Sequence, residues 1–274
     1  MPAAVVPVAV GAAAAVGEPA DIVWWRVAAA LIVSVSLQVG VNYANDYSDG
    51  VRGTDDVRVG PTRLVASGLA SPPAVKRAAL LSFAVAGVAG LAIALSTSLI
   101  LLLVGAAAIA AGWFYTGGPK PYGYLGLGEV FVFVFFGLVA TAGTTFAAIE
   151  SVTALSLVMG SAVGALACGL LVINNLRDIP TDREVGKKTL AVRLGDQRTR
   201  WFYVGLIGAA FVLSAVGAAW RLPVLLGLAA IPLAVRPVRS VLGGATGAAL
   251  IPVLGATGRL QFAWGLLVTI GLAL

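Results

Sequence analysis

Two stretches of the chain concentrate side chains that bind metal ions and phosphate groups. The first contains Asn42, Asn45, Asp46 and Asp49, and the second contains Asn174, Asn175, Arg177, Asp178 and Asp182. Residues three or four positions apart share one face of a helix, so each stretch would project several oxygen atoms to one side if it were helical. Mg²⁺ prefers hard oxygen ligands and commonly binds through one or two carboxylates together with the phosphates of a substrate. The pattern predicts a paired magnesium site for a diphosphate. The predicted ligands are Asp46, Asp49, Asp178 and Asp182.

The two stretches also resemble each other in composition and spacing. An offset of 132 residues places Asn42 on Asn174 and Asp46 on Asp178. Four apolar segments separate the two stretches, so the helices that carry them would point in the same direction. We expect these helices to face each other as halves of a parallel repeat.

Basic side chains are interleaved with the acidic ones. They are Arg52, Arg58 and Arg63 near the first stretch, and Arg177, Arg183, Lys187 and Lys188 in and after the second. Carboxylates alone would repel a diphosphate, whereas carboxylates with bound metal and nearby guanidinium or ammonium groups would hold it. We therefore expect Arg63, Lys187 and Lys188, together with Arg177, to stabilise the charge of a departing diphosphate.

The composition excludes several other chemistries. The chain has no histidine, which removes His-based metal sites and Ser-His-Asp or Cys-His catalysis. Its one cysteine, Cys168, cannot form an intrachain disulfide and lies in an apolar run, as a packing residue would. The sequence has no GxxxxGK(S/T) phosphate loop, and the glycines of segment 123–128 lack the strand context of a dinucleotide site.

The elements that must position these residues are transmembrane helices. Of 274 residues, 59% are hydrophobic and only 11% are charged, which excludes a soluble monomer. The length predicts an all-α polytopic membrane protein with about nine spans in a single domain, residues 1–274. The predicted spans are 2–16, 22–44, 78–95, 99–115, 125–148, 152–173, 201–220, 222–235 and 256–274, with polar loops at 45–77 and 175–200. The first span is short of the ~20 residues needed to cross a membrane.

The basic residues predict the orientation of the chain. If the loops alternate sides, sixteen of the eighteen Lys and Arg residues lie on one side, and only Arg26 and Arg221 lie elsewhere. By the positive-inside rule that side is cytoplasmic, and an odd number of spans places the C-terminus outside the cell membrane. The net charge of +6 thus indicates membrane topology and not a nucleic-acid partner. No feature of the sequence predicts an oligomeric state.

The polar stretches resemble the motifs of a known protein family. Segments 42–55, 60–63 and 174–195 are similar to the 1,4-dihydroxy-2-naphthoate polyprenyltransferase branch of the UbiA superfamily of intramembrane prenyltransferases. Segments 115–119 and 126–129 extend the resemblance to nearly the whole chain. The resemblance implies nine helices around a central cavity, two Asp-rich motifs that bind Mg²⁺ and a polyprenyl diphosphate, and a role in menaquinone synthesis.

The family motifs transfer to this chain unevenly. The family pattern NDxxDxxxD begins at Asn45, but its last position is Gly53, and Asp55 follows two residues later as in the naphthoate branch. The resemblance thus adds Asp55 as a metal ligand. A Tyr-x-x-x-Lys motif of relatives is present only as Tyr115 and Lys120, one residue too long. The predicted substrate-binding residues are Asn42, Asn45, Arg63, Tyr115, Lys120, Glu129, Asn174, Asn175, Arg177, Lys187 and Lys188.

The predicted reaction is the electrophilic prenylation of an aromatic ring. The donor is a polyprenyl diphosphate, and the acceptor implied by the resemblance is dihydroxynaphthoate, which loses CO₂. Glu129 is a further site candidate because an ionisable residue inside a span is expensive and often functional. Two alternatives stay open at this point. The acceptor could be 4-hydroxybenzoate or a sugar phosphate, or the chain could be an ion or solute transporter.

Overall fold

The computed structural model describes residues 1–54 and 62–274, and these residues form helices joined by loops, with no β-strand. The helical elements are α1 (Pro2–Ala15), α2 (Trp24–Arg52), α3 (Pro72–Ser96), α4 (Ile100–Phe114), η1 (Tyr122–Leu125), α5 (Gly128–Val132), η2 (Phe133–Val139), α6 (Ala140–Ile149), α7 (Ala154–Glu184), α8 (Leu190–Leu194), α9 (Asp196–Gly217), η3 (Leu222–Ala230), α10 (Ile231–Leu242), η4 (Gly247–Leu250) and α11 (Ile251–Ala273).

These elements make nine long helical segments in the described part of the chain. The elements α5, η2 and α6 form one unbroken run, η3 continues into α10, and η4 continues into α11. Seven segments are long and apolar enough to cross a membrane, and the two shorter apolar ones are α1 and α4. The prediction of an all-α polytopic membrane protein with about nine helices is confirmed.

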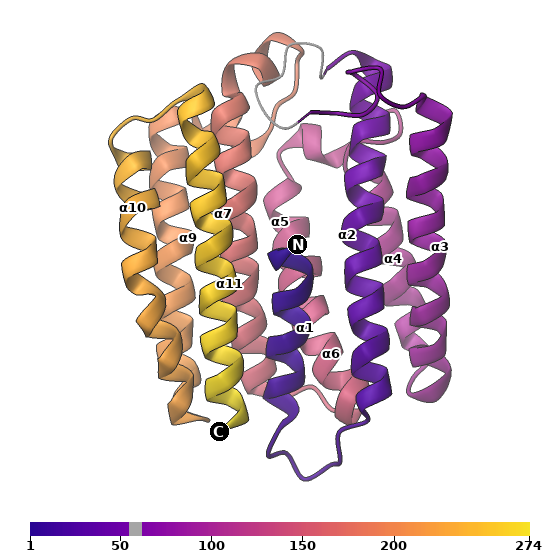
Figure 1. Cartoon of the computed structure of the whole chain (residues 1–274), viewed down its shortest axis with the longest axis vertical. Helices are drawn as coiled ribbons and strands as arrows, with labels where there is room; N and C mark the ends of the chain where they lie inside the picture. Colours follow the sequence, from indigo (N-terminus) through magenta and orange to yellow (C-terminus); the bar gives the residue numbers. More distant parts are fainter. Residues whose placement is uncertain (55–61) are drawn as a thin grey trace.

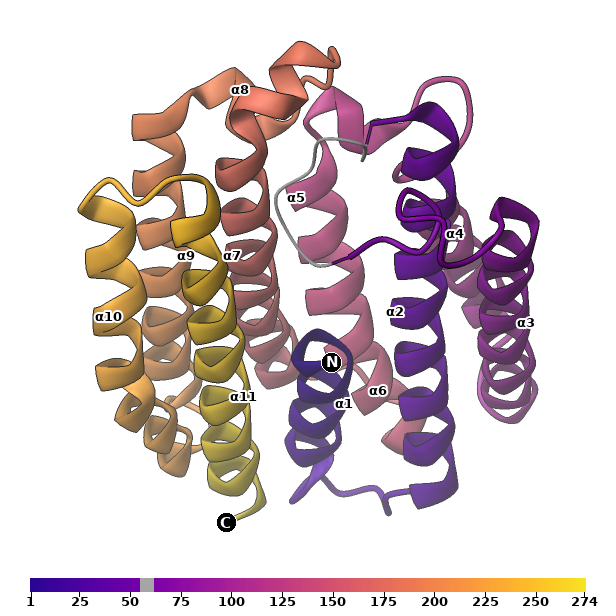
Figure 2. The same ribbon diagram turned by 45° about the horizontal axis from the view of Figure 1, so that its top comes forward.

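The helices form a bundle with two sides (Figure 1). Helices α2, α3 and α4 make one side, α7, α9, α10 and α11 make the other, and α1, α5 and α6 lie between them in both views. The C-terminal ends of α2 and α7 lie at the same end of the bundle, which Figure 2 turns toward the reader. We call this the motif end, because the two polar stretches lie there. The predicted parallel direction of the two motif helices agrees with this arrangement.

The two motif helices are longer than the sequence predicts. Helix α2 continues to Arg52 instead of ending at residue 44, and α7 continues to Glu184 instead of residue 173. Asn and Asp are weak helix formers, but tertiary contacts override such preferences. Helix α2 ends where Gly53 adopts a left-handed conformation, with φ of 71°, which glycine accepts without strain. The first parts of segments 45–77 and 175–200 are therefore helical, so the predicted metal ligands Asp46, Asp49, Asp178 and Asp182 lie on helices.

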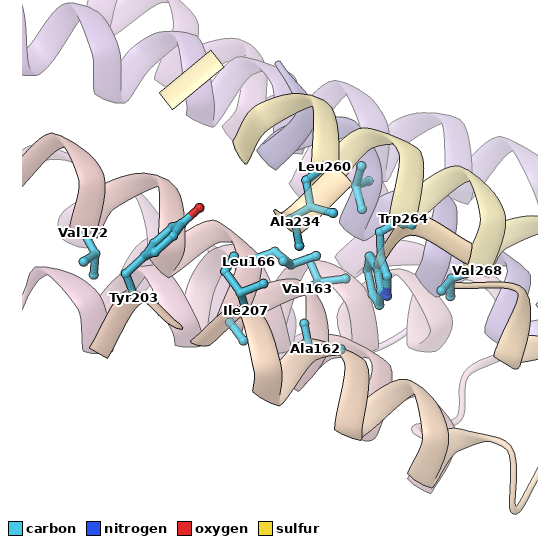
Figure 3. Close-up of a cluster of buried hydrophobic side chains, with 14 of the residues drawn as sticks. Ala162, Val163, Leu166, Val172, Tyr203, Ile207, Ala234, Leu260, Trp264 and Val268 are labelled. Carbon is cyan, nitrogen blue, oxygen red and sulfur yellow. The ribbon is translucent and has the colours of Figure 1, made fainter. Parts of the chain in front are cut away.

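The largest buried cluster lies on the α7, α9 and α11 side (Figure 3). Leu166 of α7, Ile207 of α9 and Leu260 of α11 pack together there. Two polar contacts cross the cluster: Trp264 Nε1 donates to Ser214 Oγ at 2.9 Å, and the hydroxyls of Tyr203 and Thr257 are 2.8 Å apart. Buried groups of this kind join helices where no water can satisfy them. This side of the bundle is a continuous, well-connected core.

A close helix contact fixes the middle of the bundle. A Cβ atom added at Gly137 of η2 would lie 2.5 Å from Gly164 Cα of α7, so only glycine allows the two backbones to approach so closely. The segment η2 is a π-helix, a form that often marks functional sites. This contact holds the α5–η2–α6 run against α7 and presents its aromatic residues to the interior.

Two arginines close the end of the bundle opposite the motif end. Arg26 pairs with Glu150 at 2.7 Å and donates to the carbonyl oxygen of Ser96, the last residue of α3, at 2.6 Å. Arg221 donates to the carbonyl oxygens of Ala13 and Leu272, at the ends of α1 and α11. A cation at a helix C-terminus satisfies free carbonyls and complements the helix dipole. The two basic residues that the charge count leaves outside the motif end thus have a structural role.

Candidate active site

A cavity of about 830 Å³ runs from the motif end into the bundle. Its polar part is lined by Asn42, Asn45, Asp49, Arg63, Tyr115, Thr116, Tyr124, Asn174, Asn175, Asp178, Asp182, Lys187 and Thr189. Its apolar part is lined by side chains of α2, α3, α4, η2 and α6, among them Leu37, Ile93, Val104, Phe135 and Val139. One opening therefore joins a charged surface to a long hydrocarbon interior.

Helix α2 contributes one ion pair to the polar part. Asn42, Asn45 and Asp49 line the cavity, and their spacing of three and four residues keeps them on one helix face. Asp49 is buried, accepts a hydrogen bond from Tyr124 Oη at 2.6 Å, and lies 3.4 Å from Lys187 Nζ. Its carboxylate thus connects α2 to two loops that are distant in the sequence.

The contacts with Asp49 shift the pKa values of Tyr124 and Lys187. The ammonium of Lys187 lies 4.7 Å from the centre of the Tyr124 ring. Burial, together with the charge of Asp49, raises the pKa of Tyr124, so it remains a hydrogen-bond donor. Burial lowers the pKa of Lys187, but Asp49 and Tyr124 raise it more, and the net shift is upward. Lys187 therefore stays protonated and can hold an anion at the cavity wall.

Helix α7 contributes the second set of carboxylates. Asn174, Asn175, Asp178 and Asp182 all line the cavity. Arg177 forms a bidentate pair with the neighbouring Asp178, with N–O distances of 2.6 and 2.7 Å. Asp182 accepts a hydrogen bond from Thr189 Oγ1 at 3.4 Å. Two carboxylates of α7 thus face the same cavity as Asp49 of α2.

The matching positions on α2 and α7 differ from the predicted ones. At an offset of 129 residues, Asn45 and Asp49 line the cavity as Asn174 and Asp178 do; at the predicted offset of 132, Asn42 lines it as Asn174 does, but Asp46 does not. A shift of three residues along α2 preserves the residue types Asn and Asp, but of the two acids Asp46 and Asp49 only Asp49 lines the cavity. Only the positions on the inner face can share a ligand.

Several predicted residues lie outside the cavity lining. Asp46 accepts hydrogen bonds from the backbone N–H groups of a neighbouring loop, and Arg177 faces Asp178. Lys120 and Lys188 are exposed. Their proposed roles stay predictions. Asp55 lies outside the described residues. The predicted residues that do line the cavity are Asn42, Asn45, Asp49, Arg63, Tyr115, Asn174, Asn175, Asp178, Asp182 and Lys187.

Glu129 supports the cavity wall from behind. It is buried, and its Oε1 accepts a hydrogen bond from Asn175 Nδ2 at 2.9 Å. The thiol of Cys168 donates to the Glu129 backbone oxygen at 3.1 Å, so this cysteine is a buried packing residue as the sequence indicates. Glu129 therefore orients Asn175, which lines the cavity, instead of lining the cavity itself.

The loop after α4 contributes residues that sequence reasoning missed. Thr116 lines the cavity, and its hydroxyl donates to Asn45 Oδ1 at 2.9 Å. Arg52 donates to the backbone carbonyls of Thr116 and Gly118, so it fixes this loop instead of facing the cavity. The only sequence signal was the local density of tyrosines in segment 115–124. Contacts between residues so far apart in the sequence leave no spacing pattern that could predict them.

Next to the polar residues, aromatic side chains line the cavity and form what we call the aromatic wall. The rings of Tyr115 and Tyr122 meet edge to face with centroids 5.5 Å apart, and Tyr122 stacks on Phe131 at 4.0 Å. All three residues line the cavity. Burial raises the pKa of both tyrosines, so their hydroxyls stay protonated. This wall offers flat apolar surface near the polar groups, which suits an aromatic ring.

The donor set suits Mg²⁺. No group of three Asp, Glu or Cys side chains within residues 1–54 and 62–274 forms a complete metal site. Mg²⁺ does not require one, since it commonly binds through one or two carboxylates plus substrate phosphates. Asp49 on one helix, and Asp178 and Asp182 on the other, supply such carboxylates around a shared space. The residues present fit a magnesium ion that binds together with a phosphorylated ligand.

Comparisons with known proteins are consistent with this geometry. Residues 4–243 match the UbiA prenyltransferase family. The 1,4-dihydroxy-2-naphthoate octaprenyltransferase of Mycobacterium tuberculosis (strain ATCC 25618 / H37Rv) is 52% identical over 273 residues, which cover 100% of this chain and 93% of that protein. The protein of the same name from Escherichia coli (strain K12) is 35% identical over 268 residues, covering 92% of this chain and 87% of the other.

A solved structure shares the fold. The apo structure of a UbiA homologue from Aeropyrum pernix K1 superposes with a TM-score of 0.76 at 15% sequence identity, and the match covers 97% of this chain and 96% of that one. The helical arrangement described above is therefore that of known UbiA structures.

Proposed function

The chain belongs to the UbiA prenyltransferase family, and on that premise we propose that it transfers a polyprenyl group from polyprenyl diphosphate to 1,4-dihydroxy-2-naphthoate. The products are diphosphate, CO₂ and demethylmenaquinol, a step of menaquinone synthesis. The name of the relative that is 52% identical over the full chain supports this acceptor. The observation that carries the proposal is the single cavity in which acidic and basic groups lead into an apolar interior.

The polar end of the cavity binds the diphosphate. Asp49, Asp178 and Asp182 would hold Mg²⁺, which neutralises diphosphate charge and makes it a better leaving group when bound. Lys187 and Arg63, which also line the cavity, donate to diphosphate oxygens directly. A UbiA homologue from Archaeoglobus fulgidus with the same fold was solved bound to GPP and Mg²⁺, which supports this pairing of ligands.

The apolar interior takes the prenyl tail. The tail is insoluble in water, and hydrophobic side chains such as Leu37, Ile93 and Phe135 cover it there. A diphosphate held at the motif end fixes one end of the donor, so the allylic carbon lies where the polar and apolar parts meet. The aromatic wall of Tyr115, Tyr122 and Phe131 adjoins this point and can stack against the acceptor ring.

The chemistry needs no strong base. The allylic C–O bond breaks and the electron pair leaves with the diphosphate, while the electron-rich ring carbon that bears the carboxylate forms the new C–C bond. Loss of CO₂ then returns an electron pair to the ring and restores aromaticity. The protein therefore binds, orients and excludes water, which is consistent with a chain that has no histidine.

We place the motif end on the cytoplasmic side of the cell membrane and the C-terminus outside. The support is the sequence count, in which sixteen of the eighteen Lys and Arg residues fall in segments on one side. The two exceptions, Arg26 and Arg221, satisfy helix carbonyls at the other end. A cysteine-accessibility assay in intact cells tests this orientation, and labelling of the motif end from outside would contradict it.

The function is tested by incubating the purified protein with Mg²⁺, a polyprenyl diphosphate and dihydroxynaphthoate, followed by mass spectrometry. We expect demethylmenaquinol and an equal amount of CO₂. A parallel reaction with 4-hydroxybenzoate decides the acceptor, and a higher kcat/KM for hydroxybenzoate would overturn the proposal. Omission of Mg²⁺ should abolish turnover.

A further inference from the structure

The carboxylate of Asp46 does not line the cavity and instead contacts a loop. Asp46 Oδ2 accepts a hydrogen bond from the Leu64 backbone N–H at 2.9 Å, and Oδ1 accepts one from the Val65 N–H at 3.0 Å. Its side chain is buried. Asp49, three residues later, turns to the cavity instead. The two acids of one short motif thus make different contacts, Asp46 with a loop and Asp49 with the cavity.

A second contact fixes the same loop to the same face of α2. Gly50 lies one helical turn after Asp46, and a Cβ atom added at Gly50 would lie 2.6 Å from Val65 Cβ. Such a distance is too short for any real side chain, so the absence of one at Gly50 allows Val65 to reach the helix. Asp46 and Gly50 together form a docking face for this loop: Asp46 accepts its hydrogen bonds, and Gly50 leaves room for Val65.

The docked loop has an internal structure of its own. The Ser67 N–H donates to the Arg63 oxygen at 3.1 Å, the Gly68 N–H to the Val65 oxygen at 3.0 Å, and the Ala70 N–H to the Leu64 oxygen at 3.0 Å. These bonds make residues 63–70 a compact turn. Arg63 precedes the two anchored residues directly and lines the cavity. The position of Arg63 therefore depends on where Asp46 holds Leu64 and Val65.

We infer that Asp46 is a positioning residue that anchors the 63–70 turn and so sets Arg63 at the polar end of the cavity, and that Asp46 is not a magnesium ligand. Both carboxylate oxygens accept N–H groups of this turn, and Asp46 does not line the cavity that Asp49, Asp178 and Asp182 line. The benefit to catalysis rests on the proposed function, because Arg63 acts there on the diphosphate. The anchoring itself does not depend on that function.

The test compares Asp46→Asn, Gly50→Ala and Asp49→Asn in the purified full-length protein. Asparagine has the shape of aspartate, but its NH₂ group would meet one of the two backbone N–H donors. Gly50→Ala keeps the Asp46 carboxylate and displaces the turn by steric contact alone. Asp49→Asn is the matched comparison for a ligand three residues away.

Hydrogen exchange of peptides that cover residues 62–70, measured in detergent without substrate or metal, reports the anchor directly. We expect Asp46→Asn and Gly50→Ala to accelerate exchange at Leu64 and Val65 at least about tenfold, since hydrogen bonds to a charged acceptor are lost or strained. Asp49→Asn should leave this exchange at the wild-type rate. Unchanged exchange in Asp46→Asn would overturn the inference.

Kinetics separate positioning from metal binding. We expect Asp46→Asn and Gly50→Ala to raise KM for polyprenyl diphosphate about tenfold while the Mg²⁺ concentration at half-maximal rate stays within about twofold. Asp49→Asn should shift that Mg²⁺ concentration more than about tenfold. The double variant Asp46→Asn/Arg63→Met should be no worse than Arg63→Met alone, because Asp46 acts through Arg63.

A shift in Mg²⁺ dependence for Asp46→Asn equal to that for Asp49→Asn would show that Asp46 is a ligand and would overturn the inference. If the wild-type protein transfers no prenyl group, the proposed function fails, whereas the exchange experiment still decides whether Asp46 anchors the turn. The two failures are therefore distinguishable.

Discussion

Helices α2 and α7 carry similar polar motifs, but the two motifs are held in different ways. On α7, Asp178 pairs with the adjacent Arg177, and Asp182 bonds to Thr189 seven residues later. On α2, Asp49 bonds to Tyr124 and pairs with Lys187. The contacts named here for the two α7 carboxylates are local in sequence, whereas Asp49 of α2 reaches across the bundle, as Asn175 of α7 does toward Glu129.

The difference shows where the site is vulnerable. The Arg177–Asp178 pair can form once α7 forms, and the Asp182–Thr189 bond needs only the turn that follows α7. The α2 motif requires the 63–70 turn, the 115–124 loop and the 185–189 segment to be in place. We therefore expect changes in distant loops to impair the α2 motif and to leave the α7 motif intact. The predictions below test this contrast.

The largest expected effect comes from the carboxylates that line the cavity. Asp49→Asn and Asp178→Asn should each lower the rate of prenyl transfer at least about a hundredfold, because each removes a charge that would bind the metal–diphosphate unit. The measurement is product formation at saturating substrates, with thermal unfolding to confirm folding. Near-normal activity in only one variant would show that the two helices do not contribute equally.

The next largest effect is a loss of stability that we expect from a change on α7. Arg177→Met removes one partner of Asp178, and the Arg177 side chain is only 1% exposed. Breaking a fully buried pair costs about 3–5 kcal/mol, and we expect about 2–3 kcal/mol because the Asp178 side chain is 17% exposed. Denaturant unfolding in detergent measures it. A loss below about 0.5 kcal/mol would mean that this local pair does not hold the motif.

The matching change on α2 should be milder for stability and clearer in kinetics. Arg52→Met removes donors to the carbonyls of Thr116 and Gly118 but leaves an exposed site, so we expect a loss of about 1 kcal/mol. Because Thr116 bonds to Asn45 at the cavity, KM for polyprenyl diphosphate should also rise, by about threefold to tenfold. Arg177→Lys, which keeps a positive charge next to Asp178 on α7, is the control for the α7 side of the comparison. An unchanged KM would show that the 115–124 loop does not support the α2 motif.

The smallest effect should come from Lys120. It is exposed and lies outside the cavity lining, so Lys120→Ala should change kcat/KM by less than about twofold. Steady-state kinetics with both substrates measure it. A tenfold loss would restore the role that the family resemblance suggested for this lysine and would make the 115–124 loop part of the diphosphate site.

The sequence predicted the helices better than their ends and faces. Apolar runs identify membrane helices because the bilayer requires about twenty such residues, so the seven long segments were predictable, and α1 and α4 were visible as shorter apolar runs. The extension of α2 to Arg52 was not, because Asn and Asp favour loops unless distant groups pair with them. The different directions of Asp46 and Asp49 were also hidden, since the contacts that orient them come from Leu64, Val65 and Tyr124. Spacing along a helix shows which residues share a face, but not which face turns inward.

The change of polarity along the cavity has a consequence for what leaves it. Diphosphate is small and highly charged, and CO₂ is small and uncharged, whereas the prenylated ring has lost its carboxylate and is as hydrophobic as a lipid. The cavity has charged side chains such as Asp49 and Lys187 for the diphosphate and apolar side chains such as Ile93 and Val139 for the prenylated ring. The same gradient that orients the donor therefore sorts the products between water and bilayer, and the reaction delivers a membrane-soluble quinol without a separate carrier.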